Sequence, residues 1–412
     1  METRLARRLT LGDAVVIGLG SMIGAGVFSA FTPAAAAAGA GLLVGLAIAG
    51  FIAFCNATSS AQLAAQYPTS GGTYIYGRER LGEWWGFFAG WSFVVGKTAS
   101  SAAMALTFAT YLVPDAVVKP VAVAAVVALT VVNTLGVTRT ALLTRILVAI
   151  SLIALTVVVV IGLTNSTPSA AVAGPPLTVS GMLQASGFLF FAFAGYARVA
   201  TMGEEVVRPA RTIPRAIVIA LGIVLVVYAL VAVAALHAIG PAGLAASRAP
   251  LAEVAASAGI PGPGFVVQLG AAAAALGALL AMIAGIGRTG LAMARHGDLP
   301  VWFSAVHPRF RVPYRAELAL GAVVCLLIVI TDLRGAIGFS SFGVLLYYFV
   351  ANVSALTQKK DHRRYPRILA VAGAVGCVVL VAALPLPSIV AGVAVVAAGV
   401  LYRAVRLVVA RG

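Results

Sequence analysis

The sequence predicts an all-α membrane protein with about twelve transmembrane helices. Of its 412 residues, 61% are hydrophobic and only 10% are charged, and the mean hydropathy is +1.05. This composition excludes an ordinary soluble globular protein. Apolar runs of about 20 residues, which is the length that crosses a bilayer, recur along the chain with short connections. We therefore expect one transmembrane domain over residues 1–412, with spans at 11–31, 41–66, 86–113, 117–136, 144–163, 180–206, 215–238, 264–286, 316–331, 336–356, 367–384 and 387–407.

The basic residues predict the orientation of these spans. If the N-terminus is inside, then of the 28 Lys and Arg residues only Lys119, Arg248 and Arg334 fall in outer segments, and Lys97 and Arg198 fall within spans. This bias toward inner segments predicts a protein of the cytoplasmic membrane with both termini in the cytoplasm. The net charge of +16 is then explained by the orientation of the protein in the lipid bilayer. We therefore expect no nucleic-acid partner.

The first span contains a glycine-rich stretch, residues 20–28 (GSMIGAGVF). Each glycine inside a helix costs about 1 kcal/mol relative to alanine. In a bilayer, unpaired backbone is tolerated where it is buried in protein or lines a wet cavity. We therefore predict a deliberate break in this helix, which would leave free N–H groups that favour an anionic group. Close helix packing through small residues is the alternative reading.

The sixth span contains a second break candidate at residues 191–196 (FAFAGY), five spans after the first. Because five is odd, spans 1–5 and spans 6–10 would have opposite orientations in the membrane. Broken helices at matching places in two inverted halves are typical of transporters whose site lies at the midplane. The two halves would cover residues 11–163 and 180–356, and residues 367–407 would form two accessory helices.

Several spaced motifs resemble the amino acid–polyamine–organocation (APC) transporter superfamily, bacterial amino acid permease type. The resemblance covers nearly the whole chain, because the motifs agree in order from the first span to the loop after the eighth. It implies a LeuT-like fold of five plus five inverted spans, and secondary active transport of amino acids by alternating access. The motifs are Gly24-Ala25-Gly26 and the stretches 67–76 (YPTSGGTYIY), 85–91 (WGFFAGW), 203–215 (GEEVVRPARTIPR) and 292–300 (AMARHGDLP).

The two breaks should present opposite polarity to a bound molecule. The outer half of span 1 begins near Ala25, so its free N–H groups can hold a carboxylate. The outer half of span 6 ends near Ala194, so its orphan carbonyls can accept from an ammonium. This pair fits the backbone of an α-amino acid, and we expect a neutral side chain. The predicted substrate-binding residues are Ile23, Gly24, Ala25, Gly26, Phe191, Ala192 and Ala194, with Ser101 and Met104 of the third span.

Lys97 is the candidate charge of the pocket. It shares one face of the third span with Ser101 and Met104, at i, i+4 and i+7. An ammonium near the bilayer centre costs about 3 kcal/mol on insertion scales, so a functional role is favoured over chance. Snorkelling to water is the alternative for Lys97, and helix packing is the alternative for Ser101 and Met104.

Four residues are candidates for a gate or vestibule. By the resemblance, Phe191 occupies the family's aromatic gate position, although an ordinary core phenylalanine is the competing reading. Arg198 follows the second break and either lines the inner vestibule or pairs with Glu204 or Glu205. Those two glutamates either form gating ion pairs with nearby arginines or simply mark a solvated helix end.

Coupling to an ion is inferred from departures from the family. Proton-coupled members carry a lysine in the fifth span, where this chain has Ser151. The eighth span, Phe265 to Gly287, has no Ser, Thr, Asp or Glu, which disfavours a sodium site there. Lys97 remains as a proton-linked group, because burial favours the neutral form of an amine.

Other functions stay open beside amino acid permeation. They are amino acid exchange without ion coupling, transport of polyamines or other amines, and a transporter-like nutrient sensor without flux. No nucleophile–base constellation falls within the spans and no histidine has ligand-like spacing, so we expect neither an enzyme nor a metal or other cofactor.

Overall fold

The computed structural model describes residues 9–68, 71–136, 141–165, 174–200, 202 and 205–409, and within these ranges the chain is helical and contains no strand. Helices lie at all twelve predicted spans, which confirms the all-α membrane fold. The first half comprises α1 (Leu11–Met22), α2 (Ala25–Ser29), α3 (Phe31–Ala38), α4 (Leu42–Gln66), α5 (Thr73–Leu81), α6 (Glu83–Leu112), α7 (Val118–Thr134) and α8 (Ala141–Thr164). The second comprises α9 (Val179–Phe193), α10 (Ala197–Ala200), α11 (Pro209–Ala246), α12 (Pro250–Ala256), α13 (Pro263–Arg295), α14 (Tyr314–Ile330), α15 (Leu333–Leu356), α16 (Arg367–Ala383) and α17 (Leu386–Val409).

Nine segments of the described chain are long and apolar enough to cross a membrane. The other three predicted spans do not combine this length with this apolar character, for different reasons. Helices α14 and α16 have 17 residues each, and α6 is long but carries Lys97 and a serine-rich middle. Because α6 is buried among other helices, it does not need an apolar surface toward lipid.

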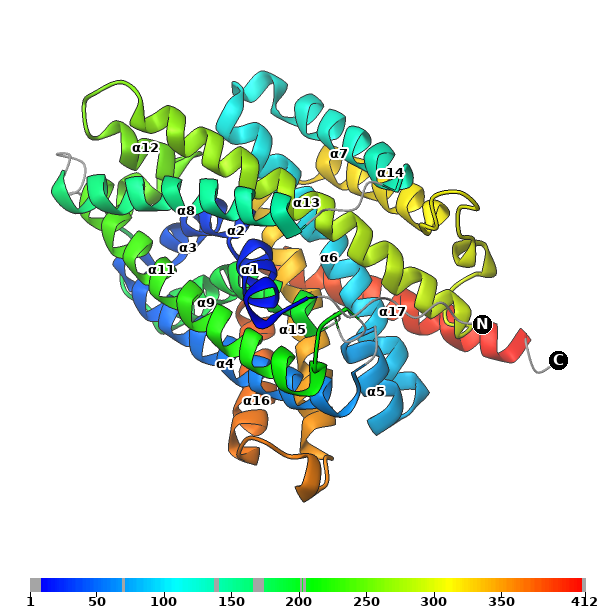
Figure 1. Ribbon diagram of the computed structural model, residues 1–412. Coiled ribbons are helices and arrows are strands. Elements are labelled where there is room, and N and C mark those ends of the chain that lie inside the picture. Colours follow the sequence, from blue (N-terminus) through cyan, green and yellow to red (C-terminus); the bar gives the residue numbers. More distant parts are fainter. Residues whose placement is uncertain are drawn as a thin grey trace.

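The first helix lies near the centre of the view in Figure 1, and it packs against α8, α11 and α13 and against the 3-10 turn at Ala194–Tyr196. Helices α6 and α15 make an especially close contact, because a Cβ on Gly343 would lie 2.7 Å from the Cα of Gly96. Small residues at such crossings let helix backbones approach in the absence of a hydrophobic driving force. Helices α7 and α14 pack side by side at the periphery.

Both predicted breaks are present. Helix α1 ends at Met22, Ile23 and Gly24 leave helical geometry (φ −76°, ψ 59° and φ −106°, ψ −144°), and α2 begins at Ala25. Helix α9 ends at Phe193, a 3-10 turn covers Ala194–Tyr196, and α10 follows. The sequence expectation of broken first and sixth spans is therefore confirmed.

Some boundaries differ from those expected. Helix α11 runs to Ala246 across a kink at Gly240, whose φ of 65° is followed by Pro241. Only glycine adopts that backbone conformation without strain, and the proline that follows lacks an N–H for the helix. Helix α13 extends to Arg295, beyond the expected end of the eighth span. That extension brings Arg288 and Thr289 into the helix that faces the cavity described below.

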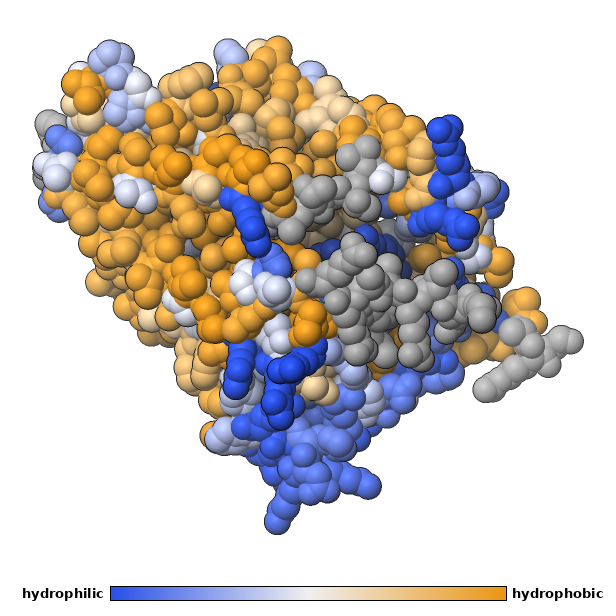
Figure 2. Space-filling model, viewed as in Figure 1, coloured by the Kyte–Doolittle hydropathy of each residue, from blue (hydrophilic) through white to orange (hydrophobic). Residues whose placement is uncertain are grey.

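The surface separates into an apolar face and a polar end (Figure 2). Hydrophilic residues gather around α5 and the loop from α15 to α16, whereas hydrophobic residues cover most of the rest of this view. Exposed apolar side chains along α8 illustrate the lipid-facing surface, where one stripe contains Leu142, Ile146, Ile150 and Ile153.

A buried ion-pair cluster joins α17 to the polar end. Asp298 and Arg403 are 4% and 5% exposed, and the Arg403 guanidinium donates to Asp298 Oδ1. The Tyr74 hydroxyl donates to Asp298 Oδ2 at 2.8 Å, and Arg78 Nη1 lies 3.6 Å from that oxygen. Burial and the Asp298 carboxylate raise the pKa of the Tyr74 phenol, so the phenol stays a neutral donor. The cluster therefore ties an accessory helix to α5 and the α13–α14 loop.

Candidate binding site at the helix breaks

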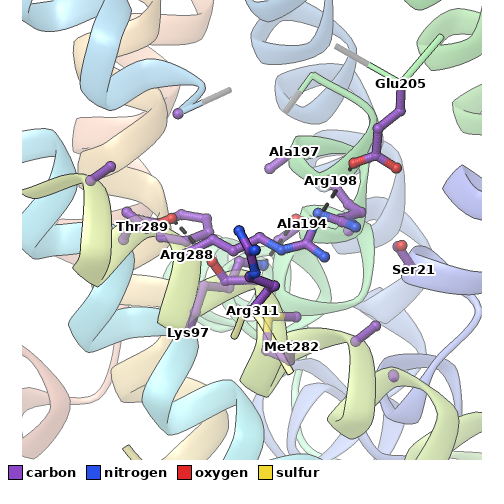
Figure 3. Close-up of a pocket in the computed structure, with 17 residues that line it drawn as sticks. Ser21, Lys97, Ala194, Ala197, Arg198, Glu205, Met282, Arg288, Thr289 and Arg311 are labelled. Carbon is purple, nitrogen blue, oxygen red and sulfur yellow. Dashed lines mark hydrogen bonds and ion pairs between the residues drawn. The ribbon is translucent and has the colours of Figure 1, made fainter. Parts of the chain in front are cut away.

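A cavity of about 290 Å³ lies beside the two breaks (Figure 3). Its volume is at the small end of the range for small-molecule sites, about ten times the volume of one liquid water. It is lined by residues of α1, α6, the second break, α10, α13 and three loops. These residues are Ser21, Gly71, Phe93, Lys97, Ala194, Gly195, Ala197, Arg198, Glu205, Ala278, Ala281, Met282, Gly285, Arg288, Thr289, Ala292 and Arg311.

Lys97 binds the end of the second broken helix. Its side chain is 4% exposed, and Nζ donates a 3.0 Å hydrogen bond to the carbonyl oxygen of Ala194. The Tyr348 hydroxyl donates to the same oxygen at 3.2 Å, and its ring stacks on that of Tyr196 at 4.9 Å between centroids. The carbonyl at the end of the outer half-helix thus already has two donors from the protein.

Tyr228 of α11 connects the two breaks. Its hydroxyl donates to the carbonyl of Met22 at 2.6 Å and to that of Ala192 at 3.1 Å. Met22 is the last residue of α1, and Ala192 lies in the last turn of α9. A hydroxyl has one hydrogen, so the two carbonyls share it. Carbonyls that the breaks deprive of helical partners are in this way satisfied inside the membrane.

The broken segments are also in direct backbone contact. A Cβ on Gly26 would lie 2.5 Å from the Cα of Ala192, and one on Gly24 would lie 2.9 Å from the Cβ of Ala278. A Cβ on Gly195 would collide with the carbonyl of Ser21. Only glycine permits these approaches.

Charged side chains face the cavity from several elements. Figure 3 shows Lys97, Arg288 and Arg311 on one side, with Arg198 and Glu205 across from them. Arg288 Nη1 lies 3.7 Å from Glu205 Oε1, so the described glutamate of the predicted pair has an arginine partner. Glu204, the other predicted glutamate, lies outside the described residues.

The structure divides the residues predicted from sequence into two groups. Lys97, Ala194, Arg198 and Glu205 line the cavity together. The others are buried and do not line it. These are Ile23, Gly24, Ala25, Gly26, Ser101, Met104, Phe191 and Ala192. The Ser101 hydroxyl donates to the Lys97 carbonyl one turn earlier, and Phe191 is 7% exposed.

Sequence reasoning missed several residues that shape this site. Tyr228 is a single tyrosine in an apolar span and Tyr348 follows Tyr347, and nothing in either local pattern distinguishes a tyrosine that binds the breaks from one that packs in the core. Arg288 and Arg311 read as ordinary inner-loop charges. Glu317, at the start of α14, is 2% exposed next to Gly287, and its Oε2 has no hydrogen-bond partner among the described residues.

Helix α13 carries a hydroxyl side chain beyond the expected end of the eighth span. The expected eighth span ended at Gly287, but the helix continues and includes Thr289, which lines the cavity. The Thr289 hydroxyl donates to Gly285 O at 3.2 Å, so a side-chain oxygen does exist on this helix near the breaks. The absence of such oxygens holds only up to Gly287.

Comparison with known proteins gives a consistent picture. The model of a family described as "Amino acid permease" matches residues 9–410. An uncharacterized transporter of Mycobacterium tuberculosis (strain H37Rv) is 60% identical over 409 residues, which cover 99% of this chain and 93% of that protein. Cationic amino acid transporter 4 of Homo sapiens is 30% identical, covering 85% of this chain and 60% of that protein. Branched-chain amino acid permease BcaP of Bacillus subtilis is 26% identical, covering 89% and 84%.

Proposed function

Because the chain belongs to the amino acid permease family, within the APC superfamily, we propose that it is a secondary active transporter that moves α-amino acids across the cytoplasmic membrane by alternating access. The observation that carries the proposal is the meeting of two broken helices beside a small cavity. Broken helices at such a meeting offer N–H groups of one half-helix and carbonyls of the other to a single ligand.

In this proposal the substrate backbone is recognised at the two breaks. The N–H groups of Ala25 and Gly26 begin the outer half of the first span and would hold the carboxylate. The Ala194 carbonyl would receive the ammonium, which must then compete with the Lys97 amine 3.0 Å away. Gly26 and Ala192 are in contact in this state, so binding requires the two half-helices to separate. The contact thus supplies the closed side of an alternating-access cycle.

The breaks address only groups that all α-amino acids share, so selection among side chains belongs to the cavity wall. A polyamine or other amine substrate would need an anionic partner in this wall. Among the described lining residues the only carboxylate is Glu205, and it is paired with Arg288. This argues against cationic side chains and polyamines, including the class in the human relative's name, and leaves neutral and acidic side chains.

We further propose that transport is coupled to protons through Lys97. Lys97 is buried at the second break, and an amine there is costly to keep charged. A lysine that alternates between a wet cavity and a closed one can take up and release a proton. We place both termini, and hence the polar end that contains α5, in the cytoplasm, on the strength of the basic residues.

Counterflow in proteoliposomes tests the proposal. Vesicles loaded with an unlabelled amino acid should accumulate the same labelled amino acid transiently and saturably, and empty vesicles should not. A nutrient sensor would bind the amino acid and show no counterflow. A polyamine transporter would exchange labelled putrescine, which we expect this protein not to do.

A further inference from the structure

We propose that the preferred substrate is an amino acid with an acidic side chain, whose carboxylate contacts the Lys97 ammonium at the second helix break. The inference rests on the proposed transport function and adds the substrate class. Neutral amino acids rank below acidic ones, and cationic amino acids are excluded.

The first support is the depth of Lys97. It lies 14 residues after Glu83, where α6 begins, which is about 21 Å along a helix. At that depth its charge is not part of the orientation signal carried by inner loops. The side chain is 4% exposed and lines the cavity, so its ammonium is already desolvated and offered to whatever occupies that space.

The second support is the sign of the cavity. Four cationic side chains line it among the described residues, and one carboxylate does. The cations are Lys97, Arg198, Arg288 and Arg311, and the carboxylate is Glu205. Walls of one sign in a low-dielectric cleft concentrate ligands of the opposite sign and repel those of like sign. A side-chain carboxylate is favoured there, and a second ammonium is opposed.

The third support is the hydrogen bonding at the break itself. Lys97 Nζ and the Tyr348 hydroxyl both donate to the Ala194 carbonyl, and the Tyr228 hydroxyl donates to the Ala192 carbonyl. The Ala194 carbonyl is also the proposed partner of the substrate's α-ammonium, so a cationic side chain would have to compete for an acceptor that already has two donors. An ammonium has three donors, and among the described residues Lys97 Nζ makes one hydrogen bond, so further N–H groups remain for a ligand. A carboxylate acceptor completes this arrangement.

Competition in counterflow tests the inference. Wild-type proteoliposomes exchanging labelled L-glutamate should be inhibited by unlabelled L-glutamate or L-aspartate, less by L-leucine, and not by L-arginine or putrescine. Succinate keeps two carboxylates and lacks the amine, so it should compete poorly. Inhibition by succinate as strong as by glutamate would overturn the amino-acid part of the assignment.

Variants of Lys97 give the decisive comparison. Lys97→Met should lower the apparent affinity for glutamate by about tenfold or more, since a desolvated charge partner is lost, while that for leucine changes little. Lys97→Glu should make arginine a competitor. Lys119→Met is the matched control, because Lys119 is an exposed lysine of α7 outside the cavity, and it should behave as wild type.

A variant at another cavity residue, Arg311, tests the inference even if the Lys97 variants do not fold. Arg311→Gln removes a cavity charge from a loop, and it should weaken glutamate relative to leucine in the same direction. If arginine competes as well as glutamate in wild type, or if neither Lys97→Met nor Arg311→Gln changes the ratio of glutamate to leucine, the inference is wrong. In both cases amino acid counterflow still stands. Absence of counterflow with every amino acid would instead overturn the proposed function.

Discussion

The hydroxyl of Tyr228 donates a 2.6 Å hydrogen bond to the carbonyl of Met22, where the first helix ends. It shares its hydrogen with Ala192, so Tyr228→Phe leaves two buried carbonyls without this donor. The Met22 carbonyl keeps a 2.8 Å hydrogen bond from the Gly24 N–H, so the variant loses a shared hydrogen bond worth about 0.5–1.5 kcal/mol, and the melting temperature in detergent should fall. Counterflow should fall as well, because the two breaks lose their common tether. Tyr365→Phe, in the α15–α16 loop, is the control, and an unchanged melting temperature in Tyr228→Phe would contradict the tether.

Gly26 should tolerate no larger side chain. In Gly26→Val the added carbon meets the backbone of Ala192, so one broken helix must move away from the other. We expect counterflow to be abolished while the protein is still inserted. Gly222→Ala is the matched control, because Gly222 is exposed and a Cβ there meets nothing within 4 Å. It should be neutral, or more stable by up to about 1 kcal/mol. Wild-type affinity in Gly26→Val would refute the close-approach argument.

Lys97 is expected to carry the proton linkage. Uptake of a neutral amino acid such as leucine should rise with an inward proton gradient and need no sodium. Lys97→Met should keep leucine counterflow, which needs no gradient, and lose the response to the gradient. Lys119→Met should keep both. Full gradient-driven accumulation by Lys97→Met would show that Lys97 only shapes the pocket. A sodium requirement in wild type would contradict proton coupling and would make the Thr289 hydroxyl a candidate sodium ligand.

Asp298 is expected to matter for stability more than for selectivity. Asp298→Asn leaves Arg403, which is 5% exposed beside the rings of Trp84 and Phe87, without its full countercharge. Breaking a buried pair from one side costs about 3–5 kcal/mol, so the variant should melt well below wild type. Asp361→Asn, an exposed carboxylate at the same polar end, should not change the melting temperature. Preference between glutamate and leucine should be the same in all three proteins.

The sequence sufficed for features that depend on neighbouring residues. Gly24 and Gly26 sit in one apolar run, so the first break could be predicted from the local cost of glycine. The depth of Lys97 followed from its position within the third span. The helix boundaries followed from run length, and the predictions were wrong where α11 runs on to Ala246 and where α13 continues past Gly287 on the cavity side.

What could not be predicted depends on how distant helices pack. Tyr228 meets Met22 across 206 residues, and Tyr348 meets Ala194 across 154. Which face of α11 or α15 points inward is set by the crossings of several helices at once, and an apolar run gives no such information. The burial of Glu317 is of the same kind, because it depends on Gly287 leaving room on the neighbouring helix.

The Asp298–Arg403 pair also has a place in the order of synthesis. Its two residues are 105 positions apart, and Arg403 belongs to the last helix. At translation rates of about 5–20 residues per second, Asp298 waits roughly 5–20 s for this partner, with Tyr74 and Arg78 as its earlier neighbours. The salt bridge between Asp298 and Arg403 therefore forms only after α17 has been synthesised. Until α17 packs against the polar end, the buried Asp298 carboxylate has only Arg78 as a cationic neighbour among the described residues.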